Sequence, residues 1–333
     1  MSVELEYGVI ITHSKRGELL DKKQIIELLK ADNIIDIYDS LLNTEYGKEL
    51  FMIPKNEVTA TKMEHAILKT LVKRSYRLLE ITPERERKVL EAFLNRYEVE
   101  NLKRIIRIKY GEKAPEASKI LIPIPQKYRT FNYEAMLEAK GIDEAMEYLV
   151  ESPFYHIALK FRELSVLEVE ALIDKIYFEK LIKTLKEEKV NGNIERMIRR
   201  EIDLKNIERI AIYISKGLVL SKELMIPSGT LSLGRLLEAS RVGLDVLKET
   251  PYEDLVIKIE KALLEKRIHK MRVLINKYMY EEAKKTCLRD NIKLGFMVGY
   301  IILCETEANN LISIVLGKEL GMENEKIKEF LIL

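Results

Sequence analysis

The feature that most constrains this fold is an eight-residue signature that occurs three times. Each copy has an acid, then asparagine three residues later, then leucine or isoleucine, and isoleucine at the end. The copies are EVENLKRI from Glu98, DLKNIERI from Asp203 and EANNLISI from Glu307. Their asparagines, Asn101, Asn206 and Asn310, are 105 and 104 residues apart. So regular a spacing indicates three diverged copies of one unit.

Two further motifs keep the same order in every unit. LLNTEY, LVESPF and LKETPY place a hydroxyl residue at Thr44, Ser152 and Thr250, which precede the signature asparagines by 57, 54 and 60 residues. Just upstream of these stand LLKA, MLEA and LLEA. The tripeptides LIP and MIP follow the first two signatures, and LIL follows the third. We therefore predict helical units at 1–117, 118–221 and 222–333.

The composition favours an all-α fold. Only 14 glycines and 8 prolines punctuate 333 residues, which allows long helices. Residues 167–186 and 207–220 are expected to be helical, and the apolar run 294–304 to be a buried core helix, since a membrane span needs roughly 20 residues. Ser152-Pro153 and Thr250-Pro251 predict helix starts with the hydroxyl at N-cap and proline at N1.

On a helix, the signature places its acid and amide on the face that also carries its apolar residues. In the middle copy that face holds Asp203, Asn206, Ile207 and Ile210. Buried polar groups need hydrogen-bond partners. We expect each acid–asparagine pair to bind backbone, or the first turn of another helix, within its own unit.

The sequence offers little catalytic chemistry. Gly47-Lys48 and Gly317-Lys318 lack the rest of a phosphate-binding loop, and the four histidines are far apart. Cys287 and Cys304 form no CxxC pair and are expected to be small buried hydrophobes. We predict no catalytic residue, cofactor, metal or small-molecule substrate. An enzyme whose residues converge from distant positions is the least favoured alternative.

Charge gives no general attraction to nucleic acid or to anionic membrane, because the net charge is only +2. A basic cluster, Lys103, Arg104, Arg107 and Lys109, follows the first signature. Basic residues also precede that signature, but acids interleave with them. A solvated helix face is therefore favoured over a site for nucleic acid or lipid headgroups. The N-terminal MSVELEYGVI has no apolar core long enough for a signal peptide.

Taken in order, these motifs resemble the C subunit of the archaeal-type (A-type, or V/A-type) ATP synthase, the counterpart of the d subunit of the vacuolar ATPase. The likeness covers essentially the whole chain. It includes EYGVIITHSKRGELL near the start, although Ile11 and Thr12 stand where the family has a small residue and arginine. The third unit, with Asn310 and with Gly317-Lys318 after it, is closest to the family pattern.

The resemblance implies a non-catalytic rotor part, shaped as a funnel of three helical domains about a pseudo-threefold axis. Its wide mouth would receive the end of the central shaft, formed by the D and F subunits. Its other face would sit on the membrane proteolipid ring, at the cytoplasmic face of the cell membrane, and so couple ion flow to ATP synthesis or hydrolysis. A cytosolic helical scaffold or adaptor without a rotary role is the main alternative.

Overall fold

The structure is a computed structural model that describes residues 4–111 and 121–333. Within these ranges the secondary structure is helical and no strand occurs. The predicted all-α class is therefore confirmed.

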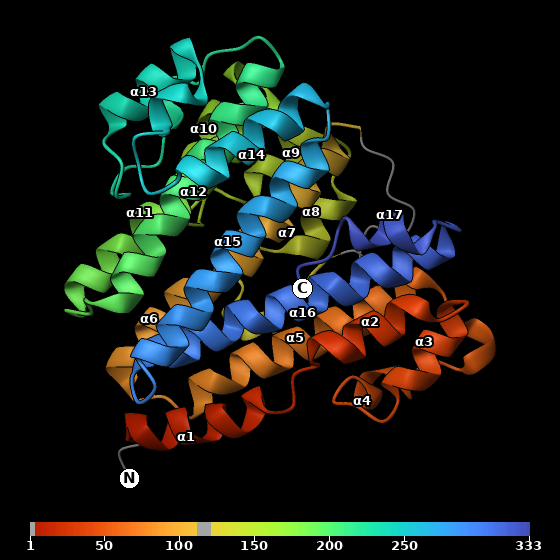
Figure 1. Cartoon of the computed structure of the whole chain (residues 1–333). Helices are drawn as coiled ribbons and strands as arrows, with labels where there is room; N and C mark the ends of the chain where they lie inside the picture. The colour runs from red at the N-terminus through yellow and green to blue at the C-terminus, as the bar shows by residue number, and fades with distance from the viewer. Residues whose placement is uncertain (1–3, 112–120) are drawn as a thin grey trace.

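Long helices form the body of the molecule (Figure 1). They are α5 (Ala60–Glu80), α6 (Glu84–Leu94), α7 (Arg96–Lys109), α11 (Val166–Glu187), α12 (Asn193–Ser215), α15 (Ile268–Arg289) and α16 (Leu294–Glu319). The three signatures lie on α7, α12 and α16. A first helix, α1 (Leu5–Arg16), packs against α16, although it belongs to the other end of the chain.

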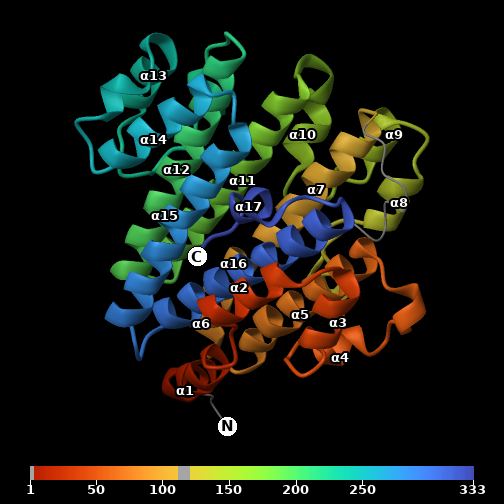
Figure 2. The same ribbon diagram turned by 45° about the vertical axis from the view of Figure 1, so that its right-hand side comes forward.

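Shorter helices gather in three groups around the long ones, and Figure 2 shows the groups at separate places on the periphery. The groups are α2 (Lys22–Lys30), α3 (Ile34–Leu41) and α4 (Gly47–Leu50); α8 (Tyr133–Glu138), α9 (Ile142–Glu147) and α10 (Tyr155–Lys160); and α13 (Leu233–Val242) with α14 (Glu253–Leu264). The chain also has α17 (Asn324–Lys328) and 3₁₀ turns at Lys55–Glu57, Gln126–Tyr128, Phe161–Glu163, Lys222–Leu224 and Leu244–Leu247.

Each signature helix carries one of these groups. Helix α7 contacts α8 and α9, α12 contacts α13 and α14, and α16 contacts α2 and α3. The long helices also pack pairwise, α5 on α16, α11 on α7 and α15 on α12. Their buried apolar side chains form one continuous cluster that reaches all three groups.

Local sequence explains where several of these helices begin and how deeply they lie. Ser165 caps α11 in a capping box with Glu168, and α12 follows Gly192, whose φ of 84° lies in the region that favours glycine. In α16, every residue from Leu294 to Cys304 is buried. The predicted core helix is thus confirmed, as is the helix over 167–186.

Two local predictions were wrong. The helix expected over 207–220 ends at Ser215, and residues 216–220 are not helical. The hydroxyl of the second motif is not the N-cap either, because α4, α10 and α14 have Tyr46, Phe154 and Tyr252 at that position. The hydroxyl instead stabilises the turn before the helix, where proline restricts φ without interrupting any helical hydrogen bond.

Candidate functional site

The signature asparagines make the same contact three times. Each side chain donates to the carbonyl and accepts from the amide of a single isoleucine. The pairs are Asn101 with Ile122, at 2.8 and 2.8 Å, Asn206 with Ile226, at 2.8 and 2.9 Å, and Asn310 with Ile332, at 2.8 and 2.8 Å. All three asparagines are buried, as expected. These isoleucines are the central residues of LIP, MIP and LIL, so each amide fixes the segment that follows its own signature helix.

The signature acids are buried as well, and each binds the peripheral group carried by its helix. Glu98 accepts from the amide of Thr130 at 2.6 Å and from its hydroxyl at 2.9 Å. Asp203 accepts from the amides of Thr230 and Leu231, both at 3.0 Å. Glu307 accepts from the Leu20 amide and, at 2.7 Å, from the Arg74 guanidinium. These bonds connect each signature helix to the chain that enters a peripheral group.

A tyrosine hydroxyl completes each acid's contacts. Tyr46 donates to Glu307 at 2.6 Å and Tyr252 donates to Asp203 at 2.8 Å, and both are the aromatic residues of the second motif. The middle motif has Phe154 instead, and there Tyr133 of α8 donates to Glu98 at 3.1 Å. Burial raises the pKa of Glu98, and the pKa of Tyr133 is raised first by burial and then by the Glu98 charge.

The motif hydroxyls form three equivalent turns. Thr44, Ser152 and Thr250 each donate to the leucine carbonyl three residues back, at 2.6, 2.7 and 2.5 Å. Each also accepts from the amide of the motif aromatic, at 3.1 to 3.2 Å. The turn therefore sets the position of the aromatic ring just before its helix begins.

The expectation that each pair binds within its own unit was wrong for all three acids and also for Asn101 and Asn206, whereas Asn310 does bind within its unit. With units at 1–117, 118–221 and 222–333, Glu98 binds residues of the second unit and Asp203 binds residues of the third. Glu307 binds Leu20 and Tyr46, so the last signature returns to the first part of the chain. Each acid lies one helical turn from its asparagine, and the asparagine binds the LIP, MIP or LIL segment that follows the helix. The acid is therefore placed beside the chain that comes after that segment in the first two copies, and beside the start of the chain in the third.

A lysine contact joins two of the signature helices to the same peripheral groups that their acids bind. Lys109 stands eight residues after Asn101 and donates to the carbonyl of Ala139. Lys318 stands eight residues after Asn310 and donates to the carbonyl of Ala31. Both alanines are the last residues of copies of the LLKA-type motif. The middle signature helix lacks this contact, because Ile214 stands eight residues after Asn206. Two of the three signature helices thus also hold their peripheral group near their C-terminal end.

The three signature helices also meet one another. Arg96, Glu201 and Glu305 each stand two residues before a signature acid. Arg96 binds both carboxylate oxygens of Glu201, at 2.9 and 2.8 Å, and one oxygen of Glu305, at 3.3 Å. These three residues line a cavity of about 330 Å³ between the long helices. Equivalent positions on three helices far apart in the chain therefore converge on one place.

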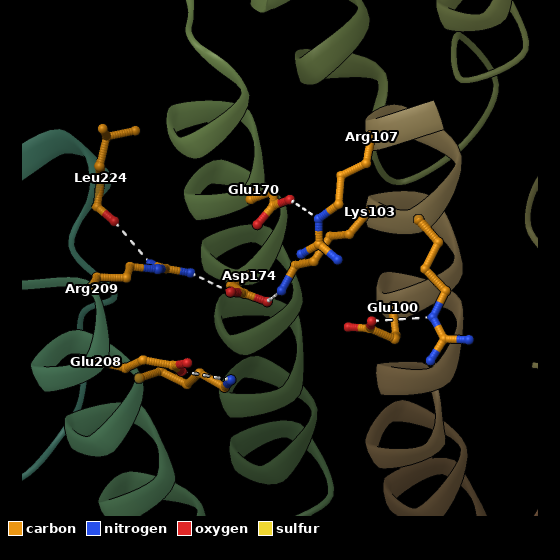
Figure 3. A network of polar contacts seen from close by, with 10 residues as sticks. Glu100, Lys103, Arg107, Glu170, Asp174, Glu208, Arg209 and Leu224 are labelled. Carbon is orange, nitrogen blue, oxygen red and sulfur yellow. Dashed lines mark hydrogen bonds and ion pairs between the residues drawn. The ribbon is translucent and has the colours of Figure 1, made fainter. Parts of the chain in front are cut away.

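A charged network continues along the same helices (Figure 3). Asp174 of α11 lies between Lys103 of α7 and Arg209 of α12, and its Oδ2 is 2.6 Å from the Arg209 guanidinium. Burial alone would raise the pKa of Asp174, but the two cations outweigh it and hold the pKa well below its usual range. Arg107 binds Glu170 of α11 at 2.6 Å in the same network. The ion pairs therefore join α7, α11 and α12.

This network corrects the interpretation of the basic cluster as a solvated face. Lys103 is buried, and upstream Arg74 is buried against Glu307. Sequence reasoning also missed Arg96, Glu201 and Glu305. The sequence could have indicated them, because all three are charged and each stands two residues before a signature acid. A search limited to identical residue types passes over such a position.

The described residues show neither a metal site nor a reactive thiol. No group of three or more histidine, cysteine or acidic side chains among them could hold a metal ion. Cys287 and Cys304 are free and buried, and burial raises their pKa values to about 11 and about 12, so both thiols stay protonated near neutral pH. None of the helices over 4–111 and 121–333 is both long and apolar enough to cross a membrane.

Comparison with known proteins agrees with this pattern. The family model of the ATP synthase (C/AC39) subunit matches residues 11–330. The A-type ATP synthase C subunit of Methanocaldococcus jannaschii is 26% identical, over 96% of this chain and 84% of its own length. The C subunits of the A-type ATP synthases of Pyrococcus horikoshii and Methanosarcina mazei are 26% and 24% identical, over 95% and 98% of this chain and 86% and 92% of their own.

The matched region contains all three signature helices and their isoleucine partners except Ile332. The resemblance inferred from the ordered motifs is thereby confirmed over nearly the full length. The chain belongs to the ATP synthase C/AC39 subunit family.

Proposed function

We propose that this protein is a non-catalytic central-stalk subunit of an A/V-type rotary ATP synthase. It would act as a socket that links the central shaft, formed by the D and F subunits, to the membrane proteolipid ring. In this role it transmits torque between ion translocation and ATP synthesis or hydrolysis, as a peripheral protein on the cytoplasmic face of the membrane. Membership of the family supports the proposal, and the threefold set of equivalent contacts around one cavity carries it.

We further propose that the units 1–117, 118–221 and 222–333 surround a pseudo-threefold axis as a funnel. Asn101, Asn206 and Asn310 make matching contacts, and this supports three equivalent bodies. The meeting of Arg96, Glu201 and Glu305 supports an axis that passes between the signature helices. A shaft is coaxial with its rotor, so an axial cavity is the expected place to receive it.

Torque transmission requires that the body not deform under load. Three features favour stiffness. The long helices share one close-packed apolar core. The signature contacts join every peripheral group to the body. Buried ion pairs of α7, α11 and α12 resist sliding between helices, because separating such charges leaves them unpaired.

The proposal is tested by binding. Purified protein is mixed with the cognate shaft, assembled from the D and F subunits, and separately with detergent-solubilised proteolipid ring. We expect it to bind each alone and to bridge the two in a ternary complex. A folded protein that binds neither would contradict the proposal and would favour a scaffold without a rotary role.

A further inference from the structure

The cavity between the signature helices has a deep end and an open end. At the deep end lie Arg96, Glu201 and Glu305, whose side chains are only 14%, 12% and 19% exposed. One helical turn further along stand Glu100, Lys205 and Asn309, the next set of equivalent positions, which also line the cavity. These are more open, with the Glu100 and Lys205 side chains 40% and 36% exposed.

The cavity continues past this second set. A further hollow of about 240 Å³ shares Glu100, Lys103 and Lys205 with it and extends to Arg107. From Arg96 to Arg107 is eleven residues of helix, or roughly 16 Å at 1.5 Å per residue. Hollows of about 330 and 240 Å³ admit side chains from the tip of a protein segment rather than a whole domain.

The deep end has more negative than positive charge. Its three equivalent positions supply two carboxylates and one guanidinium. Arg96 binds Glu201 with two short bonds and reaches Glu305 with a single longer one. The other cations of the lining are engaged elsewhere, Lys103 with Asp174, Arg104 with Glu100 and Lys205 with Glu208. Glu305 is therefore the carboxylate that is least neutralised by the chain itself.

One oxygen of that carboxylate is left without a partner. Oε1 of Glu305 is fully buried and has no hydrogen-bond partner among the described residues. The Tyr97 hydroxyl is near enough for its hydrogen bonding to lower the pKa of the carboxyl, but its contact at ordinary hydrogen-bond distance, 3.1 Å, is with the Ser75 hydroxyl. A buried carboxylate with an unsatisfied oxygen is destabilised, so a positive charge brought close to it is favoured.

We propose that the cavity receives a cationic side chain, a lysine or an arginine, from the tip of the shaft, and that Glu305 and Glu201 bind it. This inference rests on the proposed function. The incoming cation would balance the second carboxylate. An acidic tip is disfavoured, because it would meet two carboxylates against the one guanidinium that they already share.

Docking of a cation would also favour the ionised form of the Glu305 carboxyl. Burial raises the pKa of Glu305, with Arg96 opposing and Glu201 reinforcing the shift. The charged and titratable groups that face Glu305 come from three neighbouring helices: Arg96 and Tyr97 from α7, Glu201 from α12 and, through Arg96, Tyr177 from α11. Leu68 and Leu71 of α5 and Asn276 and Met279 of α15, which also line the cavity, do not titrate. A bound cation favours the ionised carboxyl, so affinity should fall as the pH is lowered.

The test compares wild type with Glu305→Gln by calorimetric titration with the cognate shaft of D and F subunits. We expect at least a tenfold loss of affinity for the variant, together with a weaker dependence of that affinity on pH. Glu325→Gln on α17 is the matched control, because it removes the same charge from an exposed side chain outside the cavity.

The outcomes separate the two claims. If wild type does not bind the shaft, the proposed function fails and the inference fails with it. If wild type binds, and Glu305→Gln binds equally tightly, the inference is overturned while the proposed function stands. The wild-type pH dependence gives a readout that does not depend on a variant folding, and binding that is unchanged or strengthened at lower pH would also overturn the inference.

Discussion

At the scale of single residues, the bidentate amide contact is the clearest repeated feature. Asn206 is fully buried, and its side chain satisfies both polar groups of the Ile226 backbone. Leucine has a similar size but can satisfy neither. We predict that Asn206→Leu lowers the free energy of unfolding by about 1–3 kcal/mol, measured by chemical denaturation.

The control for that prediction is Asn309→Leu, since Asn309 is also an amide on a signature helix but is exposed. It should change stability by less than about 0.5 kcal/mol. Equal effects of the two substitutions would show that the backbone contact of Asn206 contributes nothing specific.

Asp174 gives a prediction about pH. Its folded-state pKa is held low by Lys103 and Arg209, despite burial. A depressed pKa contributes stability that is present above the unfolded value, about 3.9, and is lost as the pH falls toward the folded value. Wild type should therefore lose this contribution in acid, and Asp174→Asn should show a shallower decline there.

At neutral pH the same variant strands two buried cations, so Asp174→Asn should be less stable by about 3–5 kcal/mol. Denaturation curves of both proteins across the acid range measure both effects. Parallel pH profiles would mean that the carboxyl titrates alike in the folded and unfolded states.

At this scale the sequence predicted burial of the signature residues but not their partners. Apolar residues on the same helix face showed that Asp203 and Asn206 are buried. Nothing in the local pattern showed that Thr230 and Ile226 would receive them, because partner choice depends on how the following segment turns back. Phe154 illustrates the limit, since its missing hydroxyl is supplied by Tyr133 from a different helix.

At the scale of elements, the loop that enters α13 lies against α12 without spare room. A Cβ built on Gly229 would stand 2.1 Å from Oδ1 of Asp203. Gly229→Ala must therefore displace the loop or the carboxylate that binds Thr230. We predict a loss of about 1–3 kcal/mol in unfolding free energy, as for other overpacked sites.

Gly141 offers a matched substitution at the start of α9. A Cβ there meets nothing within 4 Å, and its φ of −161° suits any residue. Gly141→Ala should be neutral or slightly stabilising. If both glycine variants behave alike in a thermal melt, the close contact of Gly229 with Asp203 does not limit stability.

Helix existence and type were predictable because the chain has few breakers and clear amphipathic periods. The end of α12 was not, since the apolar residues of 216–220 continue the pattern beyond Ser215. There Gly217, with φ of 68°, adopts a backbone conformation that a helix cannot continue. The hydrophobic periodicity of the sequence does not show that the helical backbone ends here.

At the scale of the whole molecule, Glu307 joins the two ends of the chain. It binds the Leu20 amide, the Tyr46 hydroxyl and the Arg74 guanidinium, and so attaches the group α2–α4 to α16. We predict that Glu307→Gln speeds amide hydrogen exchange in residues 20–50 more than elsewhere, because this group loses its charged anchor.

The corresponding variant in the middle of the chain, Asp203→Asn, should instead speed exchange in residues 230–264. A uniform increase over the whole chain in both variants would contradict separate anchoring of the peripheral groups.

The units found in the sequence and the contacts found in the structure are offset from one another. The sequence repeats with a period of about 105 residues, but each of the first two signature acids binds the group that comes after it in the chain. The third acid binds the first group, near Tyr46. The repeat period in the sequence cannot show that the last signature helix contacts the first peripheral group, because the period does not give the position of one unit relative to another.

A density map of the assembled ATP synthase tests the proposed socket most directly. We predict that this chain lies between the shaft and the proteolipid ring, with the cavity lined by Arg96, Glu201 and Glu305 opening toward the shaft end. Density for the chain at the catalytic head or along a peripheral stalk, away from the rotation axis, would contradict it.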